Sequence, residues 1–303
     1  MPDNVLICGV SGIGDTLLSF QCASMVEKQG FQPTVILATR EDVFNPVNYL
    51  FGADFNIVKG REDWTKDYCI LNDPLFIAKL RVEYNCKDFY YVEPDLLYRN
   101  PYSFDYKRFF CHPQTIRQQR LLTHRWKPHE IVYVGLVTST DNYLYGAIPE
   151  LLIELGKALP NHEIYFPKVK KWAGRELNLG NFSRQFPSNV TIHEDPKLED
   201  SLDILMKSEY GIYTDNGPSH ISYQLGQQRL LLDPRFGFTR QTGPWVARWR
   251  SSIEDSVSIN CRPEDVTRLV VTNLQVPQTQ LLPKAYVISN LNSEWSRELI
   301  FKF

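Results

Sequence analysis

The sequence has no long hydrophobic run. Crossing a bilayer takes roughly 18 to 20 consecutive apolar residues, and none of the apolar stretches comes near that length. The first of them, Val5–Val10, is short and is preceded by Pro2, Asp3 and Asn4, which carry no positive charge. A signal peptide would begin with a basic region. We therefore expect no transmembrane segment and no secretory leader.

Paired cysteines are also missing. The chain has six scattered cysteines and no C-x-x-C pair, so the spacing indicates neither a zinc site nor a redox motif. Cys8 and Cys22 fall within apolar patterns and are predicted to be buried. We expect a reduced, cytoplasmic protein without a metal site.

An excess of charge of one sign is absent as well. The 33 Lys and Arg residues nearly balance the 35 Asp and Glu residues, for a net charge of −2. This excludes a chain-wide basic field for nucleic acid, although a local basic patch remains open. With 43% hydrophobic and 22% charged residues, the composition is that of a globular protein. A chain of 303 residues suggests about two domains.

Short apolar runs alternate with helically spaced segments along most of the chain. The predicted strands are 4–10, 33–38, 55–58, 68–71, 131–137, 163–166, 190–193, 210–214, 229–232 and 256–259. The predicted helices are 16–29, 41–52, 149–159, 198–206, 218–225 and 263–271. Strands that alternate with helices predict an α/β fold with parallel sheets. Because the pattern breaks between residues 87 and 129, we expect two Rossmann-like, doubly wound domains, 1–128 and 129–275, facing across a ligand cleft.

A glycine-rich turn follows the first predicted strand. Gly9, Gly12 and Gly14 precede Asp15 at the start of a helix. Glycines let a ligand approach the backbone, and a helix N-terminus attracts anions. The spacing G-x-x-G-x-G differs from the dinucleotide fingerprint, and no Tyr-x-x-x-Lys pair accompanies it, so an NAD-dependent dehydrogenase is the weaker reading. Asp15 fits a general base facing a hydroxyl, and it also fits an ordinary first-turn carboxylate.

A second turn of this kind precedes the helix predicted at 218–225. It reads Asp215, Asn216, Gly217, Pro218, Ser219 and His220. Pro218 suits the first helical turn, and Asn216 or Gly217 can cap the helix. The turn predicts an anion site that His220 can also reach, or else a plain capped helix with a surface histidine.

Together, the two turns resemble the ADP-heptose:lipopolysaccharide heptosyltransferase family, glycosyltransferase family 9. Residues 12–18, Gly-Ile-Gly-Asp-Thr-Leu-Leu, resemble its signature G-x-G-D-x-[LI]-[LI]. Residues 215–220, followed by Gln224-Leu-Gly226, resemble its block D-[ST]-G-x-x-H…A-L-G. The resemblance implies the GT-B fold, with domain 1–128 binding the acceptor, domain 129–275 binding a nucleoside-diphosphate sugar, and segment 276–303 packing back on the first domain.

The resemblance also implies roles for single residues. Asp15 matches the catalytic base. The residues expected at the donor are Gly12, Gly14, Thr138, Ser139, Thr140, Lys168, Glu176, Asp215, Asn216, Gly217 and His220. The family's lysine after the small hydroxyl residues is missing here, and Lys168, Lys170 or Lys171 could supply its charge. No D-x-D lies in a plausible loop, so we expect an inverting, metal-independent glycosyltransferase with no cofactor beyond its nucleotide-sugar donor.

The acceptor is expected to be anionic. Residues 99–129 hold seven cations and one acid, interleaved with aromatic residues, which suits a phosphorylated glycan or lipid, or a nucleic acid. A solvated helix between the domains would fit this stretch equally well. Two other functions remain open, a nucleotide-sugar epimerase or hydrolase and a non-catalytic nucleotide or glycan binder. The sequence leaves the donor sugar, the nucleobase and the oligomeric state undetermined.

Overall fold

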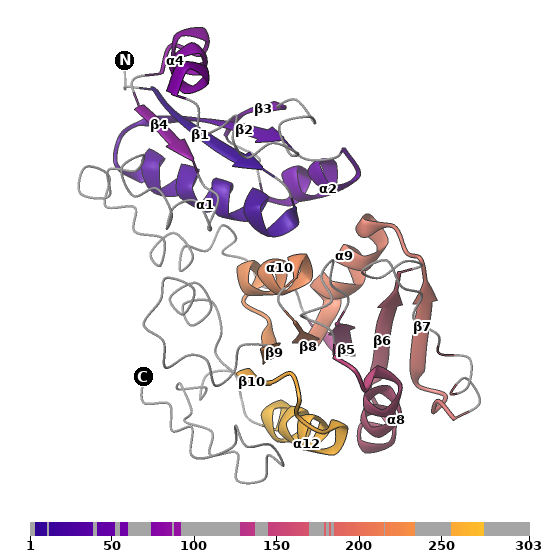
Figure 1. Ribbon diagram of the computed structural model, residues 1–303. Coiled ribbons are helices and arrows are strands. Elements are labelled where there is room, and N and C mark those ends of the chain that lie inside the picture. Colours follow the sequence, from indigo (N-terminus) through magenta and orange to yellow (C-terminus); the bar gives the residue numbers. More distant parts are fainter. Residues whose placement is uncertain are drawn as a thin grey trace. The chain divides into compact units, whose positions relative to one another are not determined.

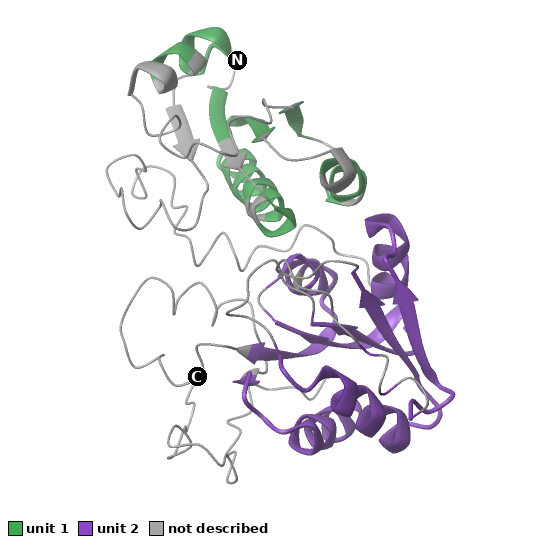
Figure 2. Ribbon diagram, turned by 45° about the vertical axis from the view of Figure 1, so that its right-hand side comes forward, with its two compact units in different colours: residues 1–123, 243–252 green, residues 124–242, 253–303 purple. Residues whose placement is uncertain are grey.

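The computed structural model separates the chain into two compact units. One comprises residues 1–123 and 243–252, and the other comprises residues 124–242 and 253–303 (Figure 2). The structure describes residues 4–10, 12–38, 41–51, 55–59, 74–86, 88–91, 128–136, 145–169, 179, 182, 185–214, 216–233 and 256–275. The predicted strand at 68–71, the predicted packing of segment 276–303 and nearly all of the basic stretch 99–129 lie outside these residues.

The first unit contains a four-stranded parallel sheet. Its strands are β1 (Asn4–Val10), β2 (Gln32–Ala38), β3 (Asn56–Lys59) and β4 (Asp88–Tyr91), in the order β3-β2-β1-β4. The apolar β1 is central and has Val5, Leu6 and Ile7 fully buried. A parallel sheet needs cover on both faces, so a continuous apolar run is the expected sequence for such a strand.

Three helices are described in the first unit, α1 (Ile13–Lys28), α2 (Glu41–Phe51) and α4 (Pro74–Glu83). Helix α1 packs against β1 and β2, and its buried side chains include Leu17, Phe20 and Val26. Cys22 on this helix is buried as predicted. Gly30 follows the helix with a φ of 86°, and this left-handed conformation favours glycine at a helix end.

The second unit contains a six-stranded parallel sheet. Its strands are β5 (His129–Gly135), β6 (Glu163–Lys168), β7 (Val190–Glu194), β8 (Ser208–Tyr213), β9 (Gln228–Asp233) and β10 (Ser256–Ser258). They lie in the order β10-β9-β8-β5-β6-β7. Numbered within the unit, this is the strand order 3-2-1-4-5-6 of the Rossmann fold. The predicted doubly wound α/β architecture is confirmed.

Helices cover both faces of this second sheet. Helices α8 (Ile148–Ala158) and α12 (Pro263–Leu274) pack against each other on one face, and α9 (Leu198–Lys207) and α10 (Gly217–Leu225) lie on the other (Figure 1). The core between the sheet and the first pair is aliphatic, with Val132, Val134 and Ile164 among its fully buried members.

The opposite face of the second sheet carries tyrosines. The ring of Tyr133 lies 5.6 Å from that of Tyr165 and 5.9 Å from that of Tyr213, between centroids. Burial raises the pKa of Tyr213 well above its ordinary value, so its hydroxyl is neutral and donates to Gln227 Oε1 at 2.6 Å. The rings need space beside them, and two glycines, Gly135 and Gly211, provide it.

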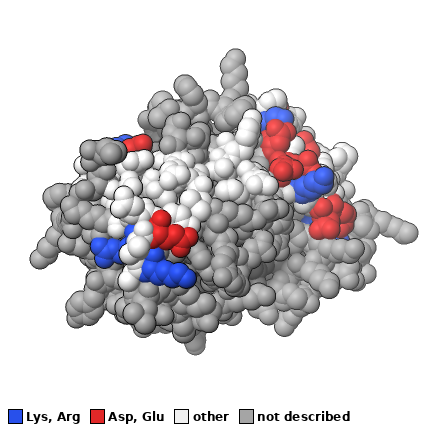
Figure 3. Space-filling model, turned by 90° about the horizontal axis from the view of Figure 1, so that it is seen from above, with Lys and Arg blue, Asp and Glu red and all other residues white. Residues whose placement is uncertain are grey.

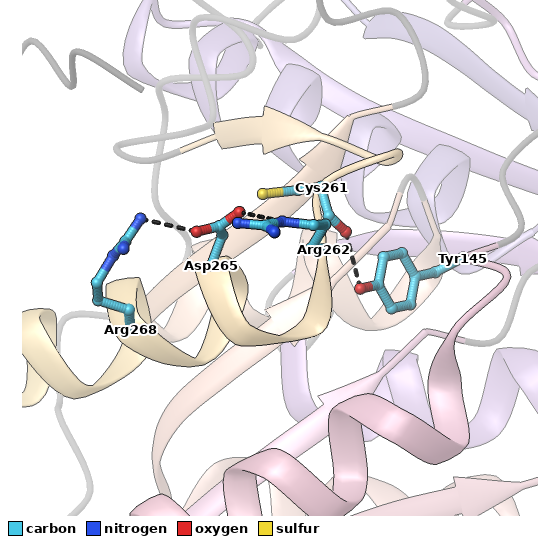
Figure 4. A network of polar contacts seen from close by, with 5 residues as sticks. All are labelled: Tyr145, Cys261, Arg262, Asp265 and Arg268. Atoms are coloured by element: carbon cyan, nitrogen blue, oxygen red, sulfur yellow. Dashed lines mark hydrogen bonds and ion pairs between the residues drawn. The ribbon is translucent and has the colours of Figure 1, made fainter. Parts of the chain in front are cut away.

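A polar network joins the start of α12 to the segment before α8 (Figure 4). The Asp265 carboxylate, only 3% exposed, accepts from Arg262 Nε at 3.0 Å and from Arg268 Nη2 at 2.8 Å. Tyr145 donates its hydroxyl hydrogen to the carbonyl of Cys261 at 2.9 Å. Burial, followed by the negative charge of Asp265, raises the pKa of the Cys261 thiol to about 11. Burial thus keeps the thiol protonated, and the hydrogen bond from Tyr145 links the start of α12 to the segment before α8.

The predicted elements agree with the structure except in one region. Each described strand and helix overlaps a predicted one, apart from α4 and β4. At the start of the stretch 87–129, where the sequence pattern breaks and predicts no particular strand, Asp88–Tyr91 forms β4 against β1. None of the helices among the described residues has both the length and the apolar character needed to span a membrane.

Candidate functional site

The strand order of each sheet fixes where a ligand site is expected. In open parallel sheets, ligands bind beyond the carboxyl ends of the strands, at the point where the strand order reverses. In the second unit that point lies between β5 and β8, where Gly135 pairs with Tyr213. In the first unit it lies between β1 and β4. Both glycine-containing turns of the sequence follow these central strands.

The turn after β1 is short and exposed. Gly12 precedes α1, and its carbonyl accepts both the backbone N–H and the hydroxyl of Thr16 at 3.1 Å. A Cβ atom added at Gly12 would meet no heavy atom within 4 Å, so the backbone here is accessible to a ligand. Gly14 and Asp15 are the second and third residues of α1. Asp15 therefore lies in the first turn of the helix, although its side chain is not among those described.

The turn after β8 is held by Asn216. Its Oδ1 accepts the backbone N–H of Ser219 at 3.0 Å, and the Ser219 hydroxyl donates to the Asn216 carbonyl at 2.7 Å. Its Nδ2 donates to the carbonyl of Gly135 at 2.6 Å. Asn216 thus caps α10 and also joins the end of β8 to the end of β5, so its side chain is engaged on both sides before any ligand arrives.

This cap reduces the number of N–H groups that α10 can offer to an anion. A free helix N-terminus presents the N–H groups of its first residues. Pro218 has no N–H, and that of Ser219 is bonded to Asn216. The first-turn N–H of Gly217 is engaged by neither of these effects, and the half-buried His220 lies three residues after it.

Two substitutions of Asn216 test its roles as the cap of α10 and as the bridge to Gly135. Loss of a helix cap costs about 1 kcal/mol, and the bond to Gly135 is lost in addition. We expect Asn216→Ala to lower the free energy of unfolding by about 2 kcal/mol. Asn216→Asp keeps the acceptor for Ser219 but places an oxygen against the Gly135 carbonyl. Urea denaturation should therefore show both variants destabilised, and a wild-type midpoint for Asn216→Asp would contradict the bridging role.

A buried arginine that the sequence reasoning missed lies beneath this turn. Arg229 on β9 is 5% exposed, and its Nη1 donates to the carbonyl of Ser219 at 2.5 Å. It thereby fastens the first turn of α10 to the sheet. The only signal in the sequence is a cation inside an apolar strand, Gln228-Arg-Leu-Leu-Leu232.

Lys168 lies at the carboxyl end of β6, beside β5. Its Nζ forms an ion pair with Glu194 Oε1 at 2.9 Å, and its side chain is 15% exposed. A phosphate would have to share this cation with a carboxylate. That Lys168 replaces the family's missing lysine stays a prediction. The ion pair with Glu194 argues against it.

Several predicted site residues lie outside the described part of the chain. They are Thr138, Ser139, Thr140, Lys170, Lys171, Glu176 and Asp215. The structure thus gathers Gly135, Lys168, Asn216, Gly217 and His220 at one edge of the second sheet. Their roles toward a ligand stay predictions.

Charges on the described surface are mixed in sign. In Figure 3, blue and red groups lie next to one another rather than in a field of one sign. Ion pairs between neighbouring residues also occur, such as Lys157 with Glu154 at 3.1 Å on α8. Among the described residues, no three His, Cys, Asp or Glu side chains come close enough together to hold a metal ion.

The two units define the class of fold. Each is Rossmann-like, as in the GT-B fold, and solved structures of glycosyltransferases are similar to this chain. The chain matched no protein-family model and no curated protein. The similarity therefore rests on three-dimensional structure.

Among the similar structures are heptosyltransferases. E. coli heptosyltransferase WaaC, solved with ADP, is 12% identical, with 89% of this chain and 99% of that chain covered, at a TM-score of 0.56. E. coli ADP-heptose lps heptosyltransferase II is 12% identical over 89% and 98% of the two chains, at 0.52. A glycosyl transferase family 9 protein from Veillonella parvula is 10% identical over 92% and 93%, at 0.51. The heptosyltransferase-like fold implied by the two sequence blocks is confirmed.

Proposed function

We propose that this chain is a glycosyltransferase that moves a sugar from a nucleoside-diphosphate sugar to an acceptor hydroxyl. The carrying observation is that the two turns that resemble the family's sequence blocks each follow a central strand of a Rossmann-like sheet. Gly12 and Asp15 open α1 after β1, and Asn216 and His220 flank the start of α10 after β8. The similar fold of WaaC, a heptosyltransferase, supports this assignment.

In the proposed reaction Asp15 acts as the general base. The acceptor oxygen attacks the anomeric carbon while its proton passes to the Asp15 carboxylate. The bond from that carbon to the diphosphate oxygen breaks at the opposite side, so the configuration inverts. General bases of this kind contribute about 10²- to 10⁴-fold to the rate. The first turn of a helix favours the ionised form of a carboxylate, which suits a base.

The leaving diphosphate is assigned to the second unit. The Gly217 N–H, the positive end of the α10 dipole and the imidazole of His220 would stabilise its growing negative charge. The scheme uses no metal ion. Thr138, Ser139, Thr140, Glu176 and Asp215 are assigned to the donor only through the sequence resemblance.

The anionic acceptor is assigned through the same resemblance to the first unit and the basic stretch 99–129. We place the reaction in the cytoplasm, the compartment that the scattered cysteines of the sequence predict.

Thermal unfolding with millimolar ADP, UDP, GDP, CDP or NAD tests the donor class. ADP is the first candidate because WaaC was solved with it. A ligand at 100 times its Kd adds about 2.7 kcal/mol to the free energy of unfolding, and we expect such a stabilisation from one nucleoside diphosphate. A shift with NAD alone would indicate the dehydrogenase instead.

Product analysis with the donor that this assay selects separates the remaining functions. Transfer requires that a glycosylated acceptor accumulate together with the nucleoside diphosphate. Release of free sugar without acceptor would indicate a hydrolase, and an altered nucleotide sugar would indicate an epimerase. Binding without turnover over all acceptors tried would favour a non-catalytic binder. Retention of transfer in EDTA is expected from the metal-independent scheme.

A further inference from the structure

The tyrosine face of the second sheet extends to the surface through His193. The ring of Tyr165 lies 5.6 Å from that of Tyr133 on one side and 6.0 Å from the imidazole of His193 on the other, between centroids. Tyr213 lies 5.9 Å from Tyr133, so the rings form one row across the neighbouring strands β8, β5, β6 and β7 (Figure 1). Separations of about 4.5 to 7 Å are those of rings in contact. The tyrosines are at most 3% exposed, whereas His193 on the edge strand β7 is exposed.

The hydroxyls of these three tyrosines have different surroundings. That of Tyr165 lies 2.9 Å from Nδ1 of His193, which accepts its hydrogen when the imidazole carries its own proton on Nε2. That of Tyr213 donates to an amide oxygen, and an amide does not take up a proton at neutral pH. Burial raises the pKa of Tyr133, and a hydrogen bond with Ser201 partly offsets this. Tyr165 is therefore the tyrosine of the row whose described hydrogen bond leads to a base.

A base at the hydroxyl decides which tyrosine is easiest to oxidise. A phenol that loses an electron becomes a strong acid, so its proton must leave as well. Burial raises the pKa of Tyr165, so its hydroxyl is protonated before oxidation and needs an acceptor already in place. Imidazole takes up protons near neutral pH and is a common proton shuttle. An oxidising equivalent on any ring of the row is thus expected to collect at Tyr165.

We propose that Tyr165 and His193 form a redox-active pair at which this row of tyrosines is oxidised by one electron. A one-electron oxidant of the peroxyl radical class takes an electron from the Tyr165 ring, while the hydroxyl proton moves to Nδ1 of His193. The products are a neutral tyrosyl radical, an imidazolium ion and a hydroperoxide anion. A soluble thiolate then returns the electron and leaves as a thiyl radical, and His193 returns the proton. The row thereby carries oxidising equivalents away from the end of β8 and toward the exposed edge strand, a function separate from sugar transfer.

Flash oxidation of the full chain by photogenerated tris(bipyridine)ruthenium(III) tests this pair. The readouts are the transient absorption and the electron spin resonance signal of the neutral tyrosyl radical. We expect a fast component in the wild-type protein that Tyr165→Phe removes. His193→Gln keeps an acceptor for the hydroxyl but removes the base, and it should slow this component by at least about tenfold. Combining the two substitutions should add nothing to the effect of Tyr165→Phe, since the residues act as one unit.

His162→Gln is the matched control. His162 Nε2 lies 3.3 Å from Glu209 Oε2, and its replacement should leave the fast component unchanged. Tyr49→Phe removes a tyrosine that is 85% exposed and should reduce only slower oxidation, for which water takes the proton. If His193→Gln has a lowered Tm, His193→Gly with added imidazole provides the second comparison, and imidazole should restore the fast component at this exposed position. Wild-type kinetics in His193→Gln, or a fast component that survives Tyr165→Phe, would overturn the proposal, and neither result bears on sugar transfer.

Discussion

Asp15→Asn is expected to lower kcat for sugar transfer by about 10²- to 10⁴-fold, the range of a lost general base. Asparagine has the size of aspartate and is also accepted near a helix N-terminus. It cannot take a proton from an attacking hydroxyl. The Kd for the nucleoside diphosphate should stay near that of wild type, because the donor is assigned to the other unit. The measurement is steady-state transfer with the donor selected by thermal unfolding.

The control for this variant is Asp203→Asn. Asp203 lies on the exposed surface of α9, where it forms an ion pair with Lys207. Its replacement changes the net charge by the same amount at a surface far along the chain from Asp15, and transfer should be unaffected. If Asp15→Asn transfers sugar at the wild-type rate, the assignment of the base is wrong, whatever the nucleotide affinity.

Hydrogen bonds from Thr16 order the helix turn that carries Asp15. The carbonyl of Gly12 is taken by the N–H and the hydroxyl of Thr16, at 3.1 Å each. These two hydrogen bonds from Thr16 fix the first turn of α1, in which Asp15 lies. Gly12 itself is exposed, and a Cβ atom added there would meet no heavy atom within 4 Å.

Central strands and their helices could be predicted from the sequence because burial on both sides leaves a continuous apolar run. The strand predicted at 4–10 coincides with β1. The two described elements that were missed give weaker local signals. The described side chains of α4, which lie between Ala78 and Glu83, are exposed, so they show no alternation of buried and exposed positions. Among the described strands, β4 pairs only with β1, and it has an aromatic, non-alternating sequence, Asp88-Phe-Tyr-Tyr91.

For the candidate site, the sequence predicts the turns but not the contacts that these turns make in the folded protein. That Asn216 and Gly217 follow a strand and open a helix was visible, since turn residues and apolar runs are local signals. That Asn216 reaches Gly135, 81 residues away, depends on the pairing of β5 with β8. The pairing of Lys168 with Glu194 depends on the register of β6 with β7. Arg229 reaches Ser219 because α10 packs against β9. Such contacts come from tertiary structure, which no local pattern encodes.

The largest expected loss of stability comes from Gly211→Ala on β8. A Cβ atom at this glycine would overlap Cε2 and the hydroxyl oxygen of Tyr213 and would lie 2.5 Å from its Cζ. The ring cannot easily move away, because it packs against Tyr133 and its hydroxyl is bonded to Gln227. Overpacking of a dense core costs about 1 to 3 kcal/mol, and we expect the upper end of that range.

Gly146→Ala is the matched control for this variant, since a Cβ atom there would meet nothing within 4 Å. Urea denaturation should show a change within about 0.5 kcal/mol for it. The cause is tested by Tyr213→Leu, which removes the ring. In that background Gly211→Ala should cost far less than alone, because the two residues are in contact and their effects are not additive. An equal cost in both backgrounds would show that the ring of Tyr213 is not what requires a glycine. Since Tyr213 also pairs with Gly135 at the switch point, the same packing that demands glycine in β8 holds in place the strand end that carries Thr214 and the start of α10.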